Sequence, residues 1–416
     1  MIKINPSFVK PGYGGHCFAE IPQTIQYLLT GGGQPALSPT LFGDLPQQYQ
    51  RIIFFFVDAF GWRFFTQHAD RYPFLKRFQD EGQVSKITSQ FPSTTAAHVT
   101  SIHTGLPVGQ SGIYEWAYYE PSLDTFISPL LFSYAGTMER NTLAQDGIDP
   151  QSILPSETFY QQLAKANVHS TIYQSSLYTP SPYSDIVFRG ADVFAYRTFT
   201  EALVNLRQAV ITGPKPAYDF LYYSNIDSIC HKHGPNSPEV EAEIDVFMTM
   251  MERIFFQEVV GKLKDTLLIV TADHGQVEVS DETLVNLKED ARFAGLERYL
   301  KHMKHDEPMI PAGSSRDLFM HVHDETLDQA QTFLAERLTD VAEVYKVSDL
   351  IEQGYFGPSP VSEALLSRIG NLVVLPYRYH SVWWFDSATY NVQFRGHHGG
   401  VTPQEMEIPF LLYSFS

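Results

Sequence analysis

One pattern constrains the fold of this chain more than any other: long apolar runs followed at once by acidic residues or histidines. The first run, IIFFFV from Ile52 to Val57, stops at Asp58. Apolar runs without alternation are typical of strands buried on both faces, as in parallel sheets. Similar runs recur in the segments DFLYYSNIDS, DTLLIVTADHG and EIPFLLYSFS. We therefore expect four strands of one central sheet.

Helix-like segments separate these strands, at residues 201–211 and 240–256. Strands that alternate with helices indicate an α/β fold with a doubly wound, mostly parallel sheet. Residues 1–50 are rich in Pro and Gly and predict an irregular arm with one helix at 21–29. In a doubly wound sheet, ligands bind beyond the carboxyl ends of the strands. A functional site is therefore expected at that edge.

The pattern changes between about residues 277 and 370, where we expect an inserted, smaller α+β cap. The catalytic core would then consist of residues 1–276 and 371–416. Within the insert, DLFMHVH, DETLDQAQTFLAERL and AEVYKVSDLIEQG favour a β-α-β unit. After it, NLVVLPY and SVWWFD resemble a hairpin-like pair of strands that leads back into the core.

Charge and composition limit the partners of the protein. The chain has 416 residues and a net charge of −18, which argues against a nucleic acid duplex, because such a partner needs a basic surface. Its two cysteines, Cys17 and Cys230, allow at most one disulfide. No apolar stretch approaches the roughly 18 to 20 residues of a membrane span, and the start lacks the apolar run of a signal peptide. We expect a cytoplasmic protein without a membrane span; the sequence leaves its oligomeric state open.

Metal-ligating side chains gather at the predicted strand ends. Asp227 and His231 stand four residues apart in NIDSICHKHG, so on a helical turn they share one face and can hold one cation. Open catalytic zinc sites use Asp and His ligands, whereas closed structural sites favour cysteine. Two such cations about 4 Å apart are the arrangement used for displacement at phosphorus. The candidate ligands are Asp58, Asp227, His231, Asp273, His274, and one or both of His397 and His398.

The segment FPSTTAAH places two adjacent threonines, Thr94 and Thr95, at the predicted start of a helix that ends at Gly105. Threonine is a good helix cap, which is the ordinary explanation for one of them. A metal ion can also turn a threonine hydroxyl into a nucleophile near neutral pH. Phosphoryl groups bind well at helix N-termini.

Each signal alone has an ordinary explanation. A single Asp at a strand end is more often a helix cap, DHG is a common turn, and HHGG can be a surface loop. Their joint occurrence at the strand ends of one sheet favours a metal site. His98, His103 and His233 are instead expected to be structural, and Cys230 is expected to pack in the core.

The order of these motifs resembles the alkaline phosphatase superfamily, and within it the type I phosphodiesterase and nucleotide pyrophosphatase family. The motifs are VDAF, FPSTTAAHVTSIHTGLPVGQSGI, NIDSICHKHGP, TADHGQ and RGHHGG, spread over about residues 50–415. The resemblance implies two divalent metal ions, most readily Zn²⁺. It implies that Asp58, Asp273 and His274 bind one ion with the nucleophile, and that Asp227, His231 and His398 bind the other. His398 is chosen over His397 because the last ligand of the family directly precedes the glycine.

The same resemblance selects Thr95 as the nucleophile. In the family this threonine lies three residues after a proline and ten before the glycine of a Thr-Gly pair, which here are Pro92 and Gly105. The sequence departs from the family at Ala96, Ala97 and His98, where Phe-Pro-Asn is usual. It also has Trp116 at the position of an asparagine that binds phosphoryl oxygens. These departures leave the choice between diester and monoester open.

The sequence thus predicts a metal-dependent hydrolase of phosphodiester or pyrophosphate bonds that forms a phosphothreonine at Thr95. Its substrate would be a small phosphorylated molecule, such as a nucleotide. One alternative is a phosphomonoesterase or phosphonate hydrolase of the same superfamily. Sulfatases are disfavoured, because their nucleophile is a modified Cys or Ser. The alternative from another class is a non-catalytic metal-binding or ligand-binding module.

Overall fold

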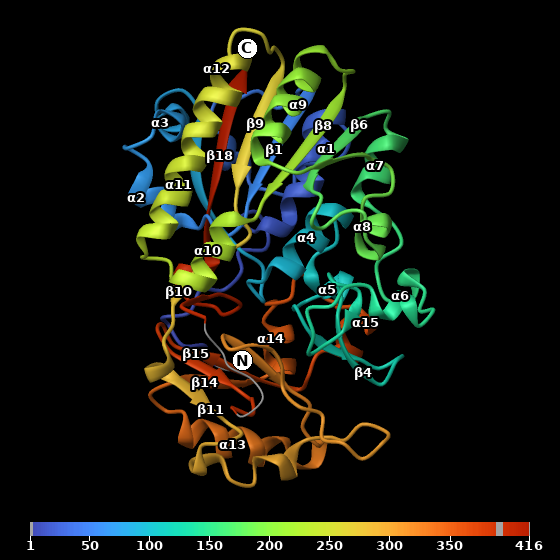
Figure 1. Ribbon diagram of the computed structural model, residues 1–416, viewed down its shortest axis with the longest axis vertical. Coiled ribbons are helices and arrows are strands. Elements are labelled where there is room, and N and C mark those ends of the chain that lie inside the picture. Colours follow the sequence, from blue (N-terminus) through green and yellow to red (C-terminus); the bar gives the residue numbers. More distant parts are fainter. Residues whose placement is uncertain (1–2, 388–393, 416) are drawn as a thin grey trace.

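The computed structural model describes residues 3–387 and 394–415. A large twisted sheet forms one end of the molecule and smaller sheets form the other (Figure 1). The large sheet has seven strands in the order β2-β18-β9-β1-β8-β6-β7. Their bounds are β1 (Arg51–Val57), β2 (Gln83–Thr88), β6 (His169–Ser175), β7 (Asp192–Tyr196), β8 (Ala217–Tyr223), β9 (Thr266–Thr271) and β18 (Glu407–Phe415).

The sheet is mostly parallel, as predicted. β1 pairs in parallel with β8 and β9, and β6 pairs in parallel with β7 and β8. β18 is the exception, because it runs antiparallel to both β9 and β2. Every residue of β1, β8 and β9 is buried, which is why these strands are apolar without alternation. The four strands predicted from the apolar runs are thus confirmed.

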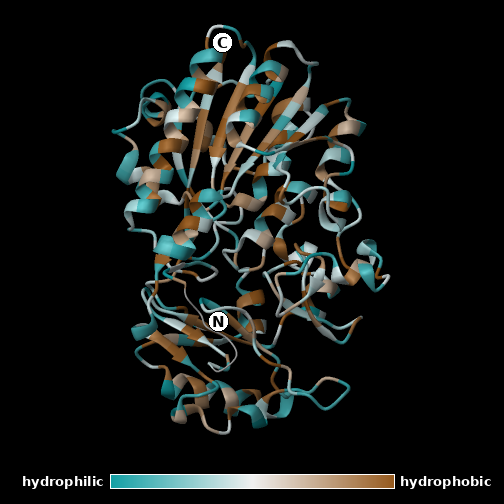
Figure 2. Cartoon of the chain, viewed as in Figure 1, coloured by the Kyte–Doolittle hydropathy of each residue, from teal (hydrophilic) through white to brown (hydrophobic). Residues whose placement is uncertain are grey.

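Helices cover both faces of this sheet, and its strands form the apolar centre of the core (Figure 2). Helix α9 (Phe199–Thr212) and helix α11 (Pro238–Met250) correspond to the two predicted helices, and α11 continues as a π-helical segment over Met251–Phe256. The N-terminal arm contains α1 (Ile21–Thr30), which ends at Gly31 in the left-handed conformation with φ 68°. The other helices of the core are α2 (Trp62–His68), α3 (Pro73–Asp80), α4 (Thr95–Thr104), α5 (Val108–Ser111), α6 (Thr142–Gln145), α7 (Phe159–Lys165), α8 (Pro182–Val187), α10 (Asn225–His233), α12 (Gln257–Val259) and α16 (Pro403–Met406).

The predicted insert contains a four-stranded sheet in the order β12-β13-β15-β14. Helix α13 (Leu327–Arg337) connects β13 to β14 as the predicted β-α-β unit requires, and a separate group of buried apolar side chains lies beneath it. The other bounds are β10 (Val277–Glu278), β11 (Leu284–Asn286), β12 (Ala312–Ser314), β13 (Asp317–Met320), β14 (Ala342–Lys346), α14 (Val347–Glu352), α15 (Glu363–Arg368), β15 (Leu372–Pro376), β16 (Ser381–Trp383) and β17 (Gly396–His397).

The predicted hairpin in this region is wrong. β15 lies between β13 and β14 and runs antiparallel to both, while β16 pairs in parallel with β11. All five residues of β15 are buried, so this strand takes a central place with two neighbours rather than the edge of a hairpin. The small sheet therefore extends past residue 370, where the insert was predicted to end; the division into two domains stays a prediction.

A further three-stranded sheet was not predicted. It consists of β3 (Tyr118–Glu120), β4 (Thr125–Ser128) and β5 (Ser133–Tyr134). Arg368 joins α15 to it, because its buried guanidinium donates to the Glu120 carboxylate at 2.8 Å and to the Ile153 carbonyl at 2.9 Å. The described part of the chain holds no helix long and apolar enough to cross a membrane.

Candidate metal and catalytic site

Three adjacent strands bring the predicted ligands to one edge of the large sheet. Asp58 follows β1 directly, Asp273 and His274 follow β9, and Asp227 lies in the first turn of α10 after β8. Because β9, β1 and β8 are parallel neighbours, their carboxyl ends meet at the same edge. His398 reaches this edge from the segment after β17. The clustering predicted from the strand ends therefore follows from the topology.

Asp58, Asp273 and His274 form the first group. They offer ligand atoms that all lie within 4.8 Å of one another. The Nε2 atom of His274 is 3.2 Å from Asp273 Oδ2 and 3.5 Å from Asp58 Oδ1. The Thr95 hydroxyl is also 3.2 Å from this Nε2. These four residues match the set that the resemblance implies for the ion at the nucleophile.

Asp227, His231 and His398 form the second group. Asp227 Oδ1 is 3.4 Å from His231 Nε2 and 3.6 Å from His398 Nε2, and the two Nε2 atoms are 3.2 Å apart. His274 adjoins this group too, because Asp227, His274 and His398 offer ligand atoms within 4.8 Å of one another. The rings of His274 and His398 are stacked with centroids 3.6 Å apart. The two groups are therefore contiguous.

Backbone carbonyls orient all three histidines. The Nδ1 atoms of His231, His274 and His398 lie 2.9, 3.1 and 2.9 Å from the carbonyl oxygens of Gly396, Gly275 and Ser93, respectively. A carbonyl oxygen only accepts, so each Nδ1 carries the proton and donates it. Each Nε2 then keeps a lone pair that faces the carboxylates, which is the arrangement of metal-binding histidines.

Too few hydrogen-bond donors reach the buried carboxylates of this site. Asp58 and Asp273 are buried, and one oxygen of each, Asp58 Oδ1 and Asp273 Oδ2, has no hydrogen-bond partner. Burial, together with the charges of Asp273 and Asp227, raises the pKa of Asp58. Burial raises the pKa of Asp273 to about 7. A cation would pair with these oxygens and remove the cost of burying them.

Burial also keeps His274 and His398 neutral. It lowers the pKa of His274 and His398 well below the usual value, and neighbouring imidazoles lower it further. Neutral imidazole is the form that binds metal ions. Unpaired carboxylate oxygens beside free Nε2 lone pairs thus form a donor set that fits Zn²⁺.

Thr94 and Thr95 have different roles at the start of α4. Thr94 is the N-cap, with φ −120° and ψ 146°, and its hydroxyl accepts from the Ala97 amide at 3.4 Å. The same hydroxyl donates to the Tyr114 carbonyl at 2.7 Å. Thr95 is the first helical residue and faces His274. The helix ends at Gly105, whose φ of 75° is left-handed, as expected.

The remaining histidines have structural partners. The buried His98 ring accepts a hydrogen bond from the Gln90 backbone amide through Nε2, at 2.9 Å. Its Nδ1 donates to the Thr94 carbonyl at 2.7 Å. His103 lies 2.7 Å from the Tyr160 hydroxyl, and His233 lies 3.6 Å from the Glu239 carboxylate. Among the residues that the structure describes, the Nδ1 atom of His397 hydrogen-bonds to the backbone of His398 alone, at 2.9 Å.

Two side chains that the sequence analysis missed support the ligands. The Tyr222 hydroxyl donates to Asp58 Oδ2, and the Gln276 amide donates to Asp227 Oδ1 at 2.6 Å. Tyr222 lies within the apolar run of β8, so its pattern gave no sign of this role. Gln276 follows DHG directly, and its position beside two candidate ligands was the only available signal.

Trp116 does not replace the family's asparagine with an equivalent group. The side chain is 40% exposed, and an indole has a single N–H donor and no acceptor. Its backbone amide donates to the buried carboxylate of Glu115. The chain therefore departs from the family pattern at this position.

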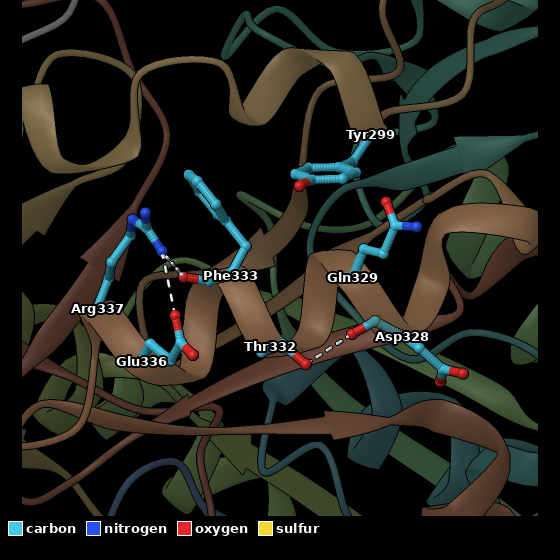
Figure 3. A pocket seen from close by; sticks show the side chains of 7 residues that line it. All are labelled: Tyr299, Asp328, Gln329, Thr332, Phe333, Glu336 and Arg337. Atoms are coloured by element: carbon cyan, nitrogen blue, oxygen red, sulfur yellow. Dashed lines mark hydrogen bonds and ion pairs between the residues drawn. The ribbon is translucent and has the colours of Figure 1, made fainter.

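A shallow hollow on the insert lies apart from these ligands. Figure 3 shows it on α13, with the Arg337 side chain beside Phe333. Its lining consists of Tyr299, Asp328, Gln329, Thr332, Phe333, Glu336 and Arg337. None of these residues belongs to either metal-binding group, so the hollow is not the candidate site.

Comparison with known proteins agrees with this geometry. The family model "Type I phosphodiesterase / nucleotide pyrophosphatase" matches residues 52–400. The chain belongs to this family. The match covers every predicted ligand and Thr95, and it includes the insert.

Solved structures share the fold. One is murine ectonucleotide pyrophosphatase/phosphodiesterase 5, an inactive threonine-to-alanine variant in complex with AMP, with a TM-score of 0.63, 18% identity and 88% of each chain covered. Another is phosphonoacetate hydrolase from Sinorhizobium meliloti in complex with phosphonoformate, with a TM-score of 0.61, 16% identity, and 88% of this chain and 91% of that chain covered. These similarities confirm the predicted alkaline phosphatase-like fold.

Another relative is a much longer protein. GPI ethanolamine phosphate transferase 2 of Candida albicans is 22% identical over 241 residues, which is 56% of this chain. The chain spans about a quarter of that protein, because the match covers 24% of it.

Proposed function

We propose that the protein is a zinc-dependent hydrolase of small phosphodiesters or pyrophosphates, such as nucleotides, and that Thr95 is its nucleophile. The observation that carries the proposal is the Thr95 hydroxyl, 3.2 Å from His274 Nε2, in a group whose buried Asp58 and Asp273 oxygens lack partners. Membership of the family supports hydrolysis at phosphorus. The AMP complex of the murine protein supports a nucleotide-sized substrate.

Asp58, Asp273 and His274 would hold one ion, and Asp227, His231 and His398 the other. When bound, two such ions would neutralise phosphoryl oxygens and lower the pKa of a nearby hydroxyl or water. The three backbone carbonyls that fix the histidine tautomers would keep every Nε2 directed at its ion.

Thr95 would act in two steps. In the first, its hydroxyl loses a proton, forms a bond to phosphorus, and the bond from phosphorus to the leaving-group oxygen breaks. In the second, water attacks the phosphorus, which still carries the part of the substrate that did not leave, the bond to Thr95 breaks, and the threonine regains a proton. Each displacement inverts the configuration, so the net outcome is retention. Thr94 holds the helix start through Ala97 and Tyr114 and leaves Thr95 free to face the ligands.

The phosphonoacetate hydrolase fold keeps a second candidate open: phosphonate or monoester hydrolysis, favoured by the loss of the usual asparagine at Trp116. A substrate panel distinguishes the candidates. The zinc-loaded protein would be assayed with bis(4-nitrophenyl) phosphate, 4-nitrophenyl phosphate, phosphonoacetate and ADP, with a metal-free sample as the control. We expect the diester or ADP to be cleaved fastest and only with metal. A preference for phosphonoacetate or the monoester would select the second candidate, and no turnover of any substrate would favour a non-catalytic metal-binding module.

A further inference from the structure

A tyrosine beside the metal-binding groups connects them to a loop outside the family motifs. Tyr178 follows β6, at the same edge of the sheet, and is half-buried. Its hydroxyl lies 3.2 Å from the Ser224 hydroxyl, and Ser224 directly precedes α10, which carries Asp227. Its ring lies 6.3 Å from that of Tyr222, whose hydroxyl donates to Asp58. Tyr178 therefore adjoins Tyr222, which supports Asp58, and the start of the helix that carries Asp227.

Arg140 lies over the ring of this tyrosine. Its guanidinium carbon is 5.6 Å from the centre of the Tyr178 ring. Arg140 belongs to the loop between β5 and α6 and is half-buried. Within residues 3–387 and 394–415, the ring of Tyr178 is its one side-chain partner, and no carboxylate forms an ion pair with its guanidinium. Arg316 and Arg368, by contrast, each pair with a buried glutamate.

We propose that Arg140 binds a second anionic group on the substrate, a carboxylate or phosphate separate from the phosphoryl group that Thr95 attacks. The proposal rests on the proposed function and deepens it, because it assigns the substrate class: organic phosphate esters with a further negative charge. A guanidinium forms two parallel hydrogen bonds with either kind of oxyanion. An arginine held by an aromatic ring loses less freedom on binding than a free one.

The segments that carry Tyr178 and Arg140 also hold exposed apolar side chains. Leu177 and Met138, which are close to Tyr178 and Arg140 in sequence, are 74% and 73% exposed. Exposed apolar side chains in the segments that carry Tyr178 and Arg140 suit a ligand with both apolar and charged parts. The protein as a whole has a charge of −18, so an anionic substrate needs a local cation for its remote charge.

A matched pair of substrates tests this role. Phenyl 4-nitrophenyl phosphate and 4-carboxyphenyl 4-nitrophenyl phosphate release the same nitrophenol and differ by one carboxylate. The zinc-loaded parent should have a KM about tenfold lower for the carboxylated ester. Arg140→Gln should lose this preference, while its kcat and KM for the phenyl ester stay within about twofold of the parent. Arg140→Lys should restore part of the preference, because it keeps the charge without the planar fork.

Arg253→Gln is the matched control, because Arg253 is an exposed arginine of the π-helical segment after α11. This variant removes the same charge but should keep the preference for the carboxylated ester, because a change in the net charge of the protein does not cause that preference. A purely structural contact between Arg140 and Tyr178 would lower the melting temperature of Arg140→Gln without changing the ratio of the two KM values. That outcome, or a parent that does not prefer the carboxylated ester, would overturn the proposal.

A binding measurement separates this proposal from the proposed function. Phenylphosphonate and 4-carboxyphenylphosphonate have a carbon–phosphorus bond in place of the ester bond that the proposed function cleaves, and their affinities can be measured by calorimetry on the zinc-loaded protein. On the parent, we expect 4-carboxyphenylphosphonate to bind about tenfold more tightly than phenylphosphonate. On Arg140→Gln, the two compounds should bind with equal affinity. If neither ester is cleaved but the two phosphonates differ in affinity as expected, the proposed hydrolase function is wrong and the anion-binding role of Arg140 is supported. If the esters are cleaved without any such difference, hydrolysis stands and the Arg140 site fails.

Discussion

The loop that carries His398 depends on one buried ion pair, and breaking this pair is the most informative perturbation of stability. Arg316 and Glu405 both have fully buried side chains. Arg316 Nε donates to Glu405 Oε1 and Nη2 donates to Oε2, each at 2.9 Å. The same carboxylate accepts from the Gly400 amide at 3.0 Å and from the Thr402 hydroxyl at 2.6 Å. Glu405 thereby joins the insert to the segment after His398.

Glu405→Gln keeps the shape and removes the charge. It leaves the buried Arg316 guanidinium without a counter-ion and places an amide NH₂ against donors, which we expect to cost about 3 to 5 kcal/mol of unfolding free energy. The matched control is Glu407→Gln, two residues along the chain. Glu407 pairs with Lys86 at 2.6 Å, but the two side chains are 27% and 45% exposed. Losing that pair should cost no more than about 1 kcal/mol.

The assay is urea unfolding of both variants and the parent in EDTA, followed by zinc titration of the folded proteins. Glu405→Gln should also bind zinc about tenfold more weakly than Glu407→Gln, because the segment that positions His398 loses its anchor. Equal unfolding free energies for the two variants would refute the reasoning about the buried pair. A large loss of stability with unchanged zinc affinity would show that Glu405 does not position His398.

Two further predictions concern the metal site. His398→Ala should lose at least one of two bound zinc ions by elemental analysis, whereas His397→Ala should keep both; full occupancy in His398→Ala would transfer the ligand role to His397. Asp273 has a pKa raised by burial to about 7, so protons compete with zinc below that pH and zinc affinity should rise as the pH increases to about 7. In the metal-free protein the same raised pKa favours the folded state at low pH, because the unfolded carboxyl ionises near 3.9, and this contribution is lost as the pH rises towards 7. The melting temperature in EDTA, compared with that in zinc, should therefore show a larger zinc effect at pH 8 than at pH 5.5, and equal effects would contradict the buried-carboxyl argument.

The central sheet and the edge that carries the ligands could be predicted from the sequence, because both depend on local patterns. A strand buried on both faces is apolar throughout, so β1, β8 and β9 can be recognised from their apolar runs. Because these strands are parallel neighbours, the residues that follow them meet at one edge of the sheet. β18 looked the same, although it runs antiparallel, because burial on both faces does not depend on strand direction.

Other features depend on contacts between distant segments and have no local signature. β15 and β16 follow each other closely in the sequence, which suggested a hairpin. The pairing of β15 with β13 and β14 is instead decided by the packing of the whole insert. The hydrogen bond from Tyr222 to Asp58 joins β8 to the residue after β1, 164 positions away in the sequence. The assignment of Thr95 rather than Thr94, and of His398 rather than His397, came from the family resemblance, since the residues alone allowed either.

Trapping the covalent intermediate tests the central claim most directly. The zinc-loaded protein would be mixed with a phosphorus-labelled substrate of the panel, quenched in acid within the first turnover, digested, and its peptides sequenced by mass spectrometry. We expect a phosphoryl group on Thr95 that still carries the part of the substrate that did not leave. This adduct should be absent from Thr95→Ala, which should fold and bind zinc but turn over several orders of magnitude more slowly. Thr94→Ala should keep most of its activity and lose about 0.5 to 2 kcal/mol of stability as a helix cap. Label on Thr94, or a Thr95→Ala protein nearly as active as the parent, would contradict the assignment of the nucleophile.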